Sequence, residues 1–332
     1  MTQEAGLMRG AACDRPVVRG TERRATARAL AGEHGGVVHR TTLAEHGIDR
    51  FGVRNEVAAG RWFRVGRHTV AVGSPEIGVV AQWWRAVWES GSGARLDGAS
   101  ALLAAGMTSF ETSVIDVTLP KTSRTYPLQG VRRHLPRVTP AVTGSGIPRV
   151  GTEIATIHAA QWAATDRQAA LLICLPMQQR LTSAPRLQLA WRSVHRSARR
   201  TLLDAVITDV TDGAQSLGEL DFTRLARKSG LPPPSHQAVR EGPHGRVYLD
   251  VSWDDVGLVV EVDGGHHLLA LNPIDDALRQ NDRVTAGERM LRIPVIGLRL
   301  VPDRFMLQVR HTYDALRIEA GRRHAARSRS SG

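Results

Sequence analysis

The sequence has 332 residues, of which 42% are hydrophobic, and a formal net charge of +12. This length is typical of two or three domains, and the hydrophobic fraction is typical of a folded globular protein. No apolar run approaches a membrane span and no signal peptide is visible, so we expect no membrane association. The two cysteines, Cys13 and Cys174, cannot form a disulfide scaffold or a zinc site, which makes a reducing cytoplasm the expected location.

The positive charge is concentrated at the front of the chain. Residues 1–207 hold 27 basic and 15 acidic side chains, whereas residues 208–319 hold 13 and 17. The tail, residues 320–332, adds four arginines. A basic front predicts a polyanionic partner such as DNA. The alternative is a general solubility charge, because only two of the 44 basic residues are lysine, as in proteins from GC-rich genomes.

Residues 1–20 are expected to be flexible, and residues 21–75 predict three helices followed by a hairpin. The second helix is short, with Thr41 or Thr42 as its N-cap, and the third begins at Asp49. Three helices followed by a two-stranded ribbon is the order of a winged helix-turn-helix, a DNA-binding domain.

In that arrangement the third helix enters the major groove and the ribbon touches backbone phosphates. The groove candidates on the third helix are Arg50, Arg54 and Asn55. The candidates for phosphate contact on the ribbon are Arg61, Arg64 and Arg67. The alternative is a helical protein-interaction domain with solvated arginines; Trp62 and Phe63, interleaved with the ribbon arginines, favour DNA.

Residues 76–207 predict a connecting domain of mixed α+β structure without evident chemistry. The tryptophans of the helix near residues 80–90 have helical spacing, which favours a role in the core over a base-stacking platform. The stretch from Ile154 to Arg200 predicts helices, with breaks at Pro176 and Pro185.

Residues 208–319 predict the element order αβββαβα, which is that of a restriction-endonuclease-like core and places this part of the chain in the α/β class. Ser216 and Glu219 form a capping box at its first helix. The fourth strand is expected over residues 289–299. The tail, residues 320–332, is expected to be disordered.

Three carboxylates fall on neighbouring strands of this core. Asp250 lies on one strand, and Glu261 and Asp263 lie on the next, two residues apart and therefore on one face of the sheet. Carboxylates on one face repel each other unless a positive charge stabilises them, and a hard divalent cation is the usual one. The rival stabiliser is an arginine of the fourth strand, Arg289 or Arg292.

The run Glu-Val-Asp-Gly-Gly-His-His resembles the endonuclease-related domain that is similar to very-short-patch-repair endonucleases, within the PD-(D/E)XK superfamily. The residues that follow the family pattern are Ser216, Glu219, Gln237, Asp250, Glu261, Asp263, Gly264 and His267. The front resembles the winged-helix antitoxin domain of the AbiEi type through the stretch GRWFRVGRHTVAV. The middle is similar to the connecting region of the same proteins.

The resemblance implies roles for these residues. Asp250 and Glu261 would hold Mg²⁺, with the backbone carbonyl of Val262 as a further ligand. Asp263 stands where the family pattern has a lysine. His267, or else His266, would handle the proton of the attacking water.

Two further residues have open roles under the resemblance. Glu219 would act through a second metal or a metal-bound water, or would cap its helix only. Gln237 would touch the phosphate or the water shell of the metal, or would be structural.

Two functions follow from the sequence. The first is a Mg²⁺-dependent DNA endonuclease that its winged helix brings to DNA. The alternative is a DNA-binding regulator of the type IV antitoxin kind, with an inactive nuclease-like domain and a nucleotidyltransferase toxin as partner. The missing lysine favours the regulator, and the retained carboxylates with His267 favour the enzyme.

Overall fold

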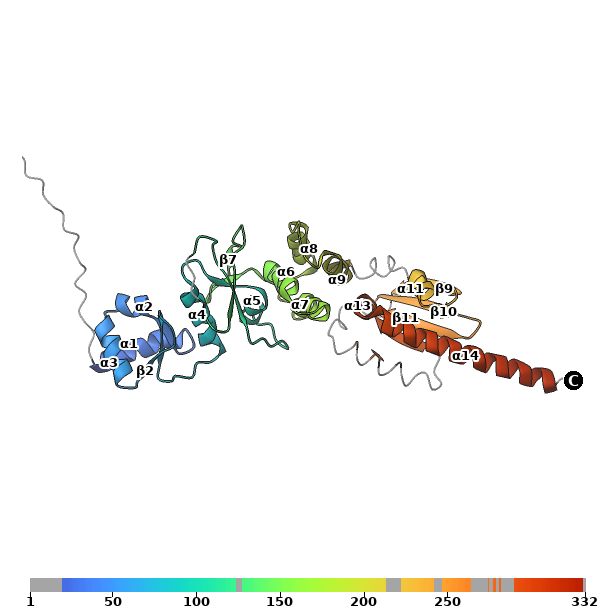
Figure 1. Ribbon diagram of the computed structural model, residues 1–332, viewed down its shortest axis with the longest axis horizontal. Coiled ribbons are helices and arrows are strands. Elements are labelled where there is room, and N and C mark those ends of the chain that lie inside the picture. The colour runs from blue at the N-terminus through green and yellow to red at the C-terminus, as the bar shows by residue number, and fades with distance from the viewer. Residues whose placement is uncertain are drawn as a thin grey trace, which may run out of the picture. The chain divides into compact units, whose positions relative to one another are not determined.

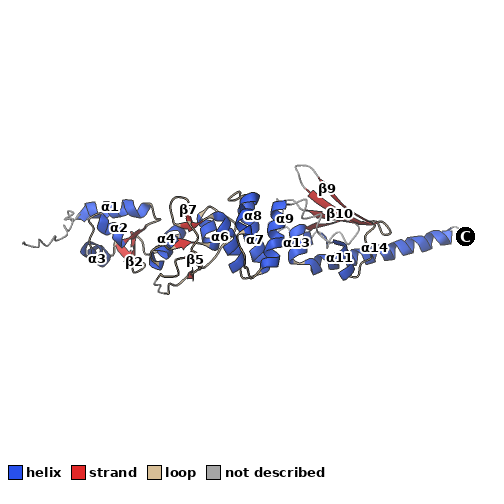
Figure 2. Cartoon of the chain, turned by 90° about the horizontal axis from the view of Figure 1, so that it is seen from above, coloured by secondary structure: helices blue, strands red, loops and turns tan. Residues whose placement is uncertain are grey.

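The structure is a computed structural model of mixed α/β class (Figures 1 and 2). The residues that it describes are 20–123, 127–212, 222–241, 247–263, 274, 277, 278, 281 and 290–330. They divide into two compact units. The first unit holds the described residues of 1–96, 117–139 and 145–148, and the second those of 97–116, 140–144 and 149–332.

The first unit begins with three helices and a small sheet. Its elements are α1 (Gly20–Gly32), β1 (Val37–His39), α2 (Arg40–Glu45), α3 (Arg50–Ala58), β2 (Trp62–Arg64) and β3 (Thr69–Val72). The strands form an antiparallel sheet of order β1-β3-β2, the front sheet. The three helices and the hairpin agree with the expected order, but β1 was not foreseen from the sequence. The side chain that caps α2 belongs to His39, and not to Thr41 or Thr42.

The front sheet is covered on both faces. On one face, Val38 and Val70 pack with Leu43, Ile48 and Val53 from α2, the following loop and α3. On the other face, Val37 and Ala71 pack with α4 (Val79–Ser90). The helix α4 contributes Ala81 to this second core, and its partly buried Trp84 and Trp88 pack against it, in line with the expected packing role of these two tryptophans. The first unit therefore extends beyond residue 75, where a domain boundary was expected.

Three short strands follow α4: β4 (Arg95–Leu96), β5 (Ile115–Thr118) and β6 (Val131–His134). The second unit opens with helices and a short hairpin. These are α5 (Gly98–Ala104), β7 (Val142–Thr143), β8 (Arg149–Val150), α6 (Thr152–Trp162), α7 (Asp166–Gln178), α8 (Ala184–Arg192) and α9 (Arg200–Asp212).

Pro176 does not break its helix, contrary to expectation. It lies in the last turn of α7, which ends two residues later at Gln178. A proline lacks the N–H that would bond to the carbonyl four residues earlier, here that of Leu172, so α7 continues through Pro176 with one intrahelical hydrogen bond fewer. Pro185 lies in the first turn of α8, where proline is well tolerated.

The C-terminal part contains a four-stranded sheet. Its described elements are α11 (Phe222–Lys228), β9 (His236–Glu241), β10 (Val247–Trp253), β11 (Leu258–Asp263), β12 (Met290–Pro294), α13 (Val295–Leu300) and α14 (Pro302–Ser330). The strand order is β12-β11-β10-β9. The pair β11–β12 is parallel and the other two pairs are antiparallel. This C-terminal sheet has one face rich in apolar side chains and one face that carries the carboxylates.

The apolar face forms the core beneath α11 and α14. Its buried side chains are Leu249, Val251, Trp253, Leu258, Val260, Val262, Leu291 and Ile293. The ring of Trp253 contacts Phe222 of α11 and Tyr313 of α14. Burial of each large apolar side chain here stabilises the folded state by about 1.5–3 kcal/mol. Figure 2 shows α14 running along this sheet and continuing past it.

Three expectations for this part are corrected. The fourth strand ends at Pro294, and Val295–Leu300 form the helix α13. The helix α9 runs across the expected boundary at residues 207 and 208, and its buried Asp209 binds Arg299 of α13 at 3.1 Å. The tail that was expected to be disordered continues α14 as far as Ser330. Within the described residues, no helix combines the length and the apolar character that a bilayer crossing requires.

Candidate functional site

One side of α3 is exposed and basic. The helix begins at the N-cap Asp49, whose Oδ1 accepts a hydrogen bond from the amide of Gly52 at 2.7 Å. Val53 points inward, so the outward positions fall on the opposite side. These outward residues are Arg50, Phe51, Arg54 and Asn55, the α3 face.

The α3 face is organised around Phe51. The ring is 47% exposed, and the guanidinium groups of Arg50 and Arg54 lie 4.8 Å and 5.1 Å from its centroid. Such stacking limits the rotamers of the two arginines without using their N–H donors. The three predicted groove residues therefore share one face.

Arg61 has a different role from the predicted phosphate contact. Its Nε donates to Oε2 of Glu56, a fully buried carboxylate on α3, and Arg23 of α1 donates to the other oxygen at 3.0 Å. Burial alone would raise the pKa of Glu56, but the hydrogen bonds from Arg61 and Arg23 outweigh it and the pKa is lowered. Arg61 therefore neutralises a buried charge and joins β2 to α3.

The other two ribbon arginines lie near the turn that joins β2 to β3, residues 65–68, which we call the wing. Arg64 is exposed at the end of β2. Arg67 is also exposed; its amide donates to Glu89 at 2.9 Å and its carbonyl accepts from Arg40 at 3.3 Å. Of the three predicted phosphate contacts, Arg64 and Arg67 are thus exposed at the wing, and Arg61 is paired with Glu56.

The carboxylates of the C-terminal sheet share one face, as expected. Asp250 of β10 pairs with Glu261 of β11, and Glu261 pairs with Arg292 of β12. Residues paired in this way lie side by side on the same face. Asp263 lies two residues beyond Glu261 on that face, opposite Tyr248. The sheet therefore brings Asp250, Glu261 and Asp263 together; we call them the acidic face.

An arginine already meets the acidic face. Glu261 is only 6% exposed, and Nε of Arg292 lies 3.6 Å from its Oε1. The backbone of Arg292 is held by buried Asn281, whose side-chain nitrogen donates to the Arg292 carbonyl at 3.1 Å and whose oxygen accepts from the Arg292 amide at 3.2 Å. The rival stabiliser foreseen for the carboxylates is thus in place, while Arg289 lies outside the described residues.

Gln237 is on the other face of the sheet. It pairs with Val251, whose side chain belongs to the apolar face, and its side-chain oxygen accepts from the hydroxyl of Thr223 at 3.2 Å. A contact with a phosphate on the acidic face would require it to cross the sheet, so the structural role is the one that fits. Glu219, His266 and His267 lie outside the described residues.

The donor set fits Mg²⁺ in part. Oxygen atoms of Asp250 and Glu261 are the hard ligands that this ion prefers, and the side chain of Val262 lies in the core, so only its carbonyl could contribute. The described part of the chain contains no group of three or more acidic, histidine or cysteine side chains arranged to hold a metal ion. The guanidinium of Arg292, 3.6 Å from Glu261, would compete with any cation for this carboxylate.

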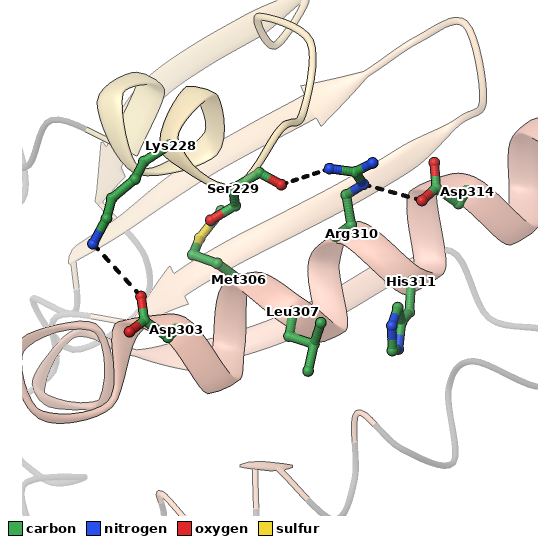
Figure 3. Close-up of a pocket in the computed structure, with 8 residues that line it drawn as sticks. All are labelled: Lys228, Ser229, Asp303, Met306, Leu307, Arg310, His311 and Asp314. Carbon is green, nitrogen blue, oxygen red and sulfur yellow. Dashed lines mark hydrogen bonds and ion pairs between the residues drawn. The ribbon is translucent and has the colours of Figure 1, made fainter.

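A separate hollow of about 490 Å³ lies between α11 and α14 (Figure 3). Its charged side chains largely pair with one another: Lys228 lies 3.8 Å from Asp303, and Arg310 lies 3.1 Å from Asp314. Arg310 also donates to the carbonyl of Ser229 at 2.8 Å. These contacts join the end of α11 to α14, which makes the hollow a structural junction.

Sequence reasoning missed two acidic residues of the front. Glu56 looked like an ordinary helix residue, although its position among Val53 and Val57 on the inward side of α3 could have identified it. Glu89 binds the wing from α4, across 20 residues of sequence, and a single sequence has no signal for such a contact.

No protein-family model matches the chain, and no curated protein matches it. Among solved structures, it is similar to the crystal structure of the Rv2827c protein from Mycobacterium tuberculosis, with a TM-score of 0.35 and 17% sequence identity. The similarity covers 66% of this chain and 87% of that chain. A likeness at this level carries no argument about function.

Proposed function

We propose that this protein binds duplex DNA through the α3 face and the wing. The observation that carries the proposal is the pair of arginines stacked on exposed Phe51. The stacked ring holds the two guanidinium groups side by side and leaves their N–H donors available to an anionic partner. Duplex DNA offers such a face phosphates and base edges at once.

The element order supports the same proposal. Three helices followed by a hairpin is the element order of a winged helix, a fold in which the third helix reads the major groove. Asp49 fixes the start of α3, so that Arg50 lies in the first turn and Arg54 one turn further along the same side. Arginine at such positions makes bidentate contacts with guanine, worth about 1–3 kcal/mol each.

The test is a mobility-shift titration with duplex DNA from upstream of the gene that encodes the protein. We expect Arg50→Ala and Arg54→Ala each to weaken binding about tenfold. The matched control is Arg192→Ala, an exposed arginine on α8. Wild-type protein that binds no duplex, or equal effects of all three variants, would overturn the proposal.

A second candidate function is hydrolysis of a phosphodiester bond at the acidic face. It is favoured by one observation, the direct pairing of Asp250 with Glu261 on one side of the sheet. The order of the C-terminal elements, in which β12 follows β11 as a parallel strand, is also compatible with a restriction-endonuclease-like core.

In this candidate function, Asp250 and Glu261 would bind Mg²⁺. The bound ion would polarise the scissile phosphate and lower the pKa of a water molecule. Asp263 cannot supply the positive charge of the family's lysine, and Arg292 is the cation beside Glu261. His267 keeps the role of proton acceptor that the resemblance gives it.

A nicking assay with Mg²⁺ distinguishes cleavage from binding alone. Wild type should nick supercoiled DNA, while Asp250→Ala and Glu261→Ala should not, with both variants still binding duplex. Absence of nicking by wild type, or equal nicking by the variants, would leave the regulator of the type IV antitoxin kind as the proposal. A nucleotidyltransferase toxin encoded beside the gene would then be its partner.

A further inference from the structure

The wing is held in place by a side chain of α4, a helix that follows the three N-terminal helices and the hairpin in the chain. The carboxylate of Glu89 accepts three hydrogen bonds from the end of the hairpin. The donors are the amide of Arg67 at 2.9 Å, the amide of His68 at 2.7 Å and the hydroxyl of Thr69 at 2.8 Å. Two consecutive amides that point at one carboxylate define the conformation of the turn between them.

A second side chain of α4 holds the other limb of the turn. Arg85, one helical turn before Glu89, donates from Nε to the carbonyl of Val65. The wing therefore presents a carbonyl to a guanidinium and amides to a carboxylate. We call Arg85 and Glu89 the wing clamp.

The sequence of the wing leaves room for the clamp. A Cβ atom built on Gly66 would overlap with the carboxylate of Glu89. The backbone of Gly66 needs no left-handed conformation, so the reason for glycine at this position is the close approach of Glu89. Any larger residue would push the carboxylate away from the amides.

We propose that Glu89 and Arg85 are positioning residues for DNA binding, so that α4 belongs to the DNA-binding module. The proposal rests on the proposed function. Arg64 directly precedes the wing and Arg67 lies within it, and a phosphate contact requires each guanidinium at a fixed place on the protein. A loose turn would have to be ordered when DNA binds, and this ordering costs affinity. The clamp orders the turn in advance.

The charge of Glu89 makes the proposal sharply testable. A carboxylate close to a phosphate contact repels DNA, so by charge alone its removal strengthens binding. Positioning predicts the opposite sign, because removal of Glu89 releases the wing. The direction of the change in affinity therefore separates the two effects.

The experiment uses full-length protein and fluorescence anisotropy on duplex DNA from upstream of the gene, over a series of salt concentrations. We expect Glu89→Ala and Glu89→Gln to weaken binding by about tenfold. In wild type, Arg64→Ala should lower the salt slope by about one, whereas in the Glu89→Ala background it should change little. Arg54→Ala, on α3, should weaken binding equally in both backgrounds.

Gly66→Ala serves as a second variant, because it displaces the carboxylate while leaving Glu89 in the chain. It should reproduce the loss of Glu89→Ala and add nothing to it. Unchanged or tighter binding by the Glu89 variants, or an undiminished effect of Arg64→Ala in their background, would overturn the inference alone. Absence of DNA binding by the wild-type protein, or an unchanged affinity of Arg54→Ala, would instead overturn the proposed function.

Discussion

Glu261 and Arg292 face each other across the parallel strands β11 and β12, with Nε of the arginine 3.6 Å from Oε1 of the glutamate. Glu261 is almost fully buried, whereas the side chain of Arg292 is 61% exposed. The arginine can thus stabilise the carboxylate while its outer edge remains in water. Under the proposed nuclease function, the same pairing would weaken the affinity of the acidic face for a divalent cation.

Arg292→Ala should strengthen Mg²⁺ binding. Two unit charges about 4 Å apart interact by roughly 1 kcal/mol in water and by more in a partly buried site, so we expect a gain of at least fivefold in affinity. Isothermal titration calorimetry with Mg²⁺ measures the change. Asp250→Ala in the Arg292→Ala background should abolish the gain; equal affinities of wild type and Arg292→Ala would show that the cation does not bind at Glu261.

Glu56 should make stability depend on pH in the acid range. Its pKa is lowered in the folded protein, so its stabilising effect is full above the unfolded value of 4.5 and is lost as pH falls through the folded value. Glu56→Gln should lower the free energy of unfolding by about 2 kcal/mol at neutral pH, because Arg23 and Arg61 lose their charged partner. Urea denaturation over a pH series should show the two proteins converging at low pH. A constant difference at every pH would contradict this account.

Two glycine-to-alanine changes should alter the stability of the fold in opposite directions. Gly230 ends α11 with a φ of +74°, and a Cβ there would overlap with the guanidinium of Arg310. Gly230→Ala should therefore cost about 1–2 kcal/mol. Gly321 lies within α14 with open space around it, so Gly321→Ala should raise the free energy of unfolding by about 0.5–1 kcal/mol. Thermal unfolding followed by circular dichroism measures both, and shifts of the same sign would refute the argument.

Tyr313 should titrate late. Burial, and then a 2.6 Å hydrogen bond from its hydroxyl to Asp255, raise the pKa of Tyr313 to about 12. Because this pKa exceeds the unfolded value of 10.0, the contribution of Tyr313 to stability is full below pH 10.0 and is lost as pH rises towards 12. The phenolate absorbance of wild type minus that of Tyr313→Phe should show the late step, and Asp255→Asn should move it to lower pH. An unmoved step would exclude Asp255 as a cause.

Local sequence signals identified most of the elements. Signals that act within a few residues can be recognised in a single sequence. Examples are the N-cap at Asp49, the glycine at the end of α11, Gly230, and the alternation of β10 and β11. The strand β1 was missed because three residues, Val37–His39, carry too short a pattern. The helix α13 was misread as strand because Val295–Leu300 are apolar throughout and buried, and burial of every side chain removes the periodicity that separates helix from strand.

The candidate sites were predictable to a similar degree. Alternation alone placed Asp250, Glu261 and Asp263 on one face, and helical spacing placed Arg50 and Arg54 together. The sequence could not reveal that Gln237 lies on the opposite face, because the register of β9 against β10 depends on tertiary structure. It also could not assign Arg61 to Glu56, since an arginine near an expected ribbon has the same appearance whether its partner is a phosphate or a carboxylate.

The packing of the front sheet on both faces has a practical consequence for protein engineering. A fragment cut after residue 75 would lack α4 and would leave Phe63, Val37 and Ala71 open to water. Such a fragment would tend to self-associate through this patch, and its oligomers would obscure any measurement of DNA affinity. An excised DNA-binding domain must therefore include α4, which covers this face of the front sheet.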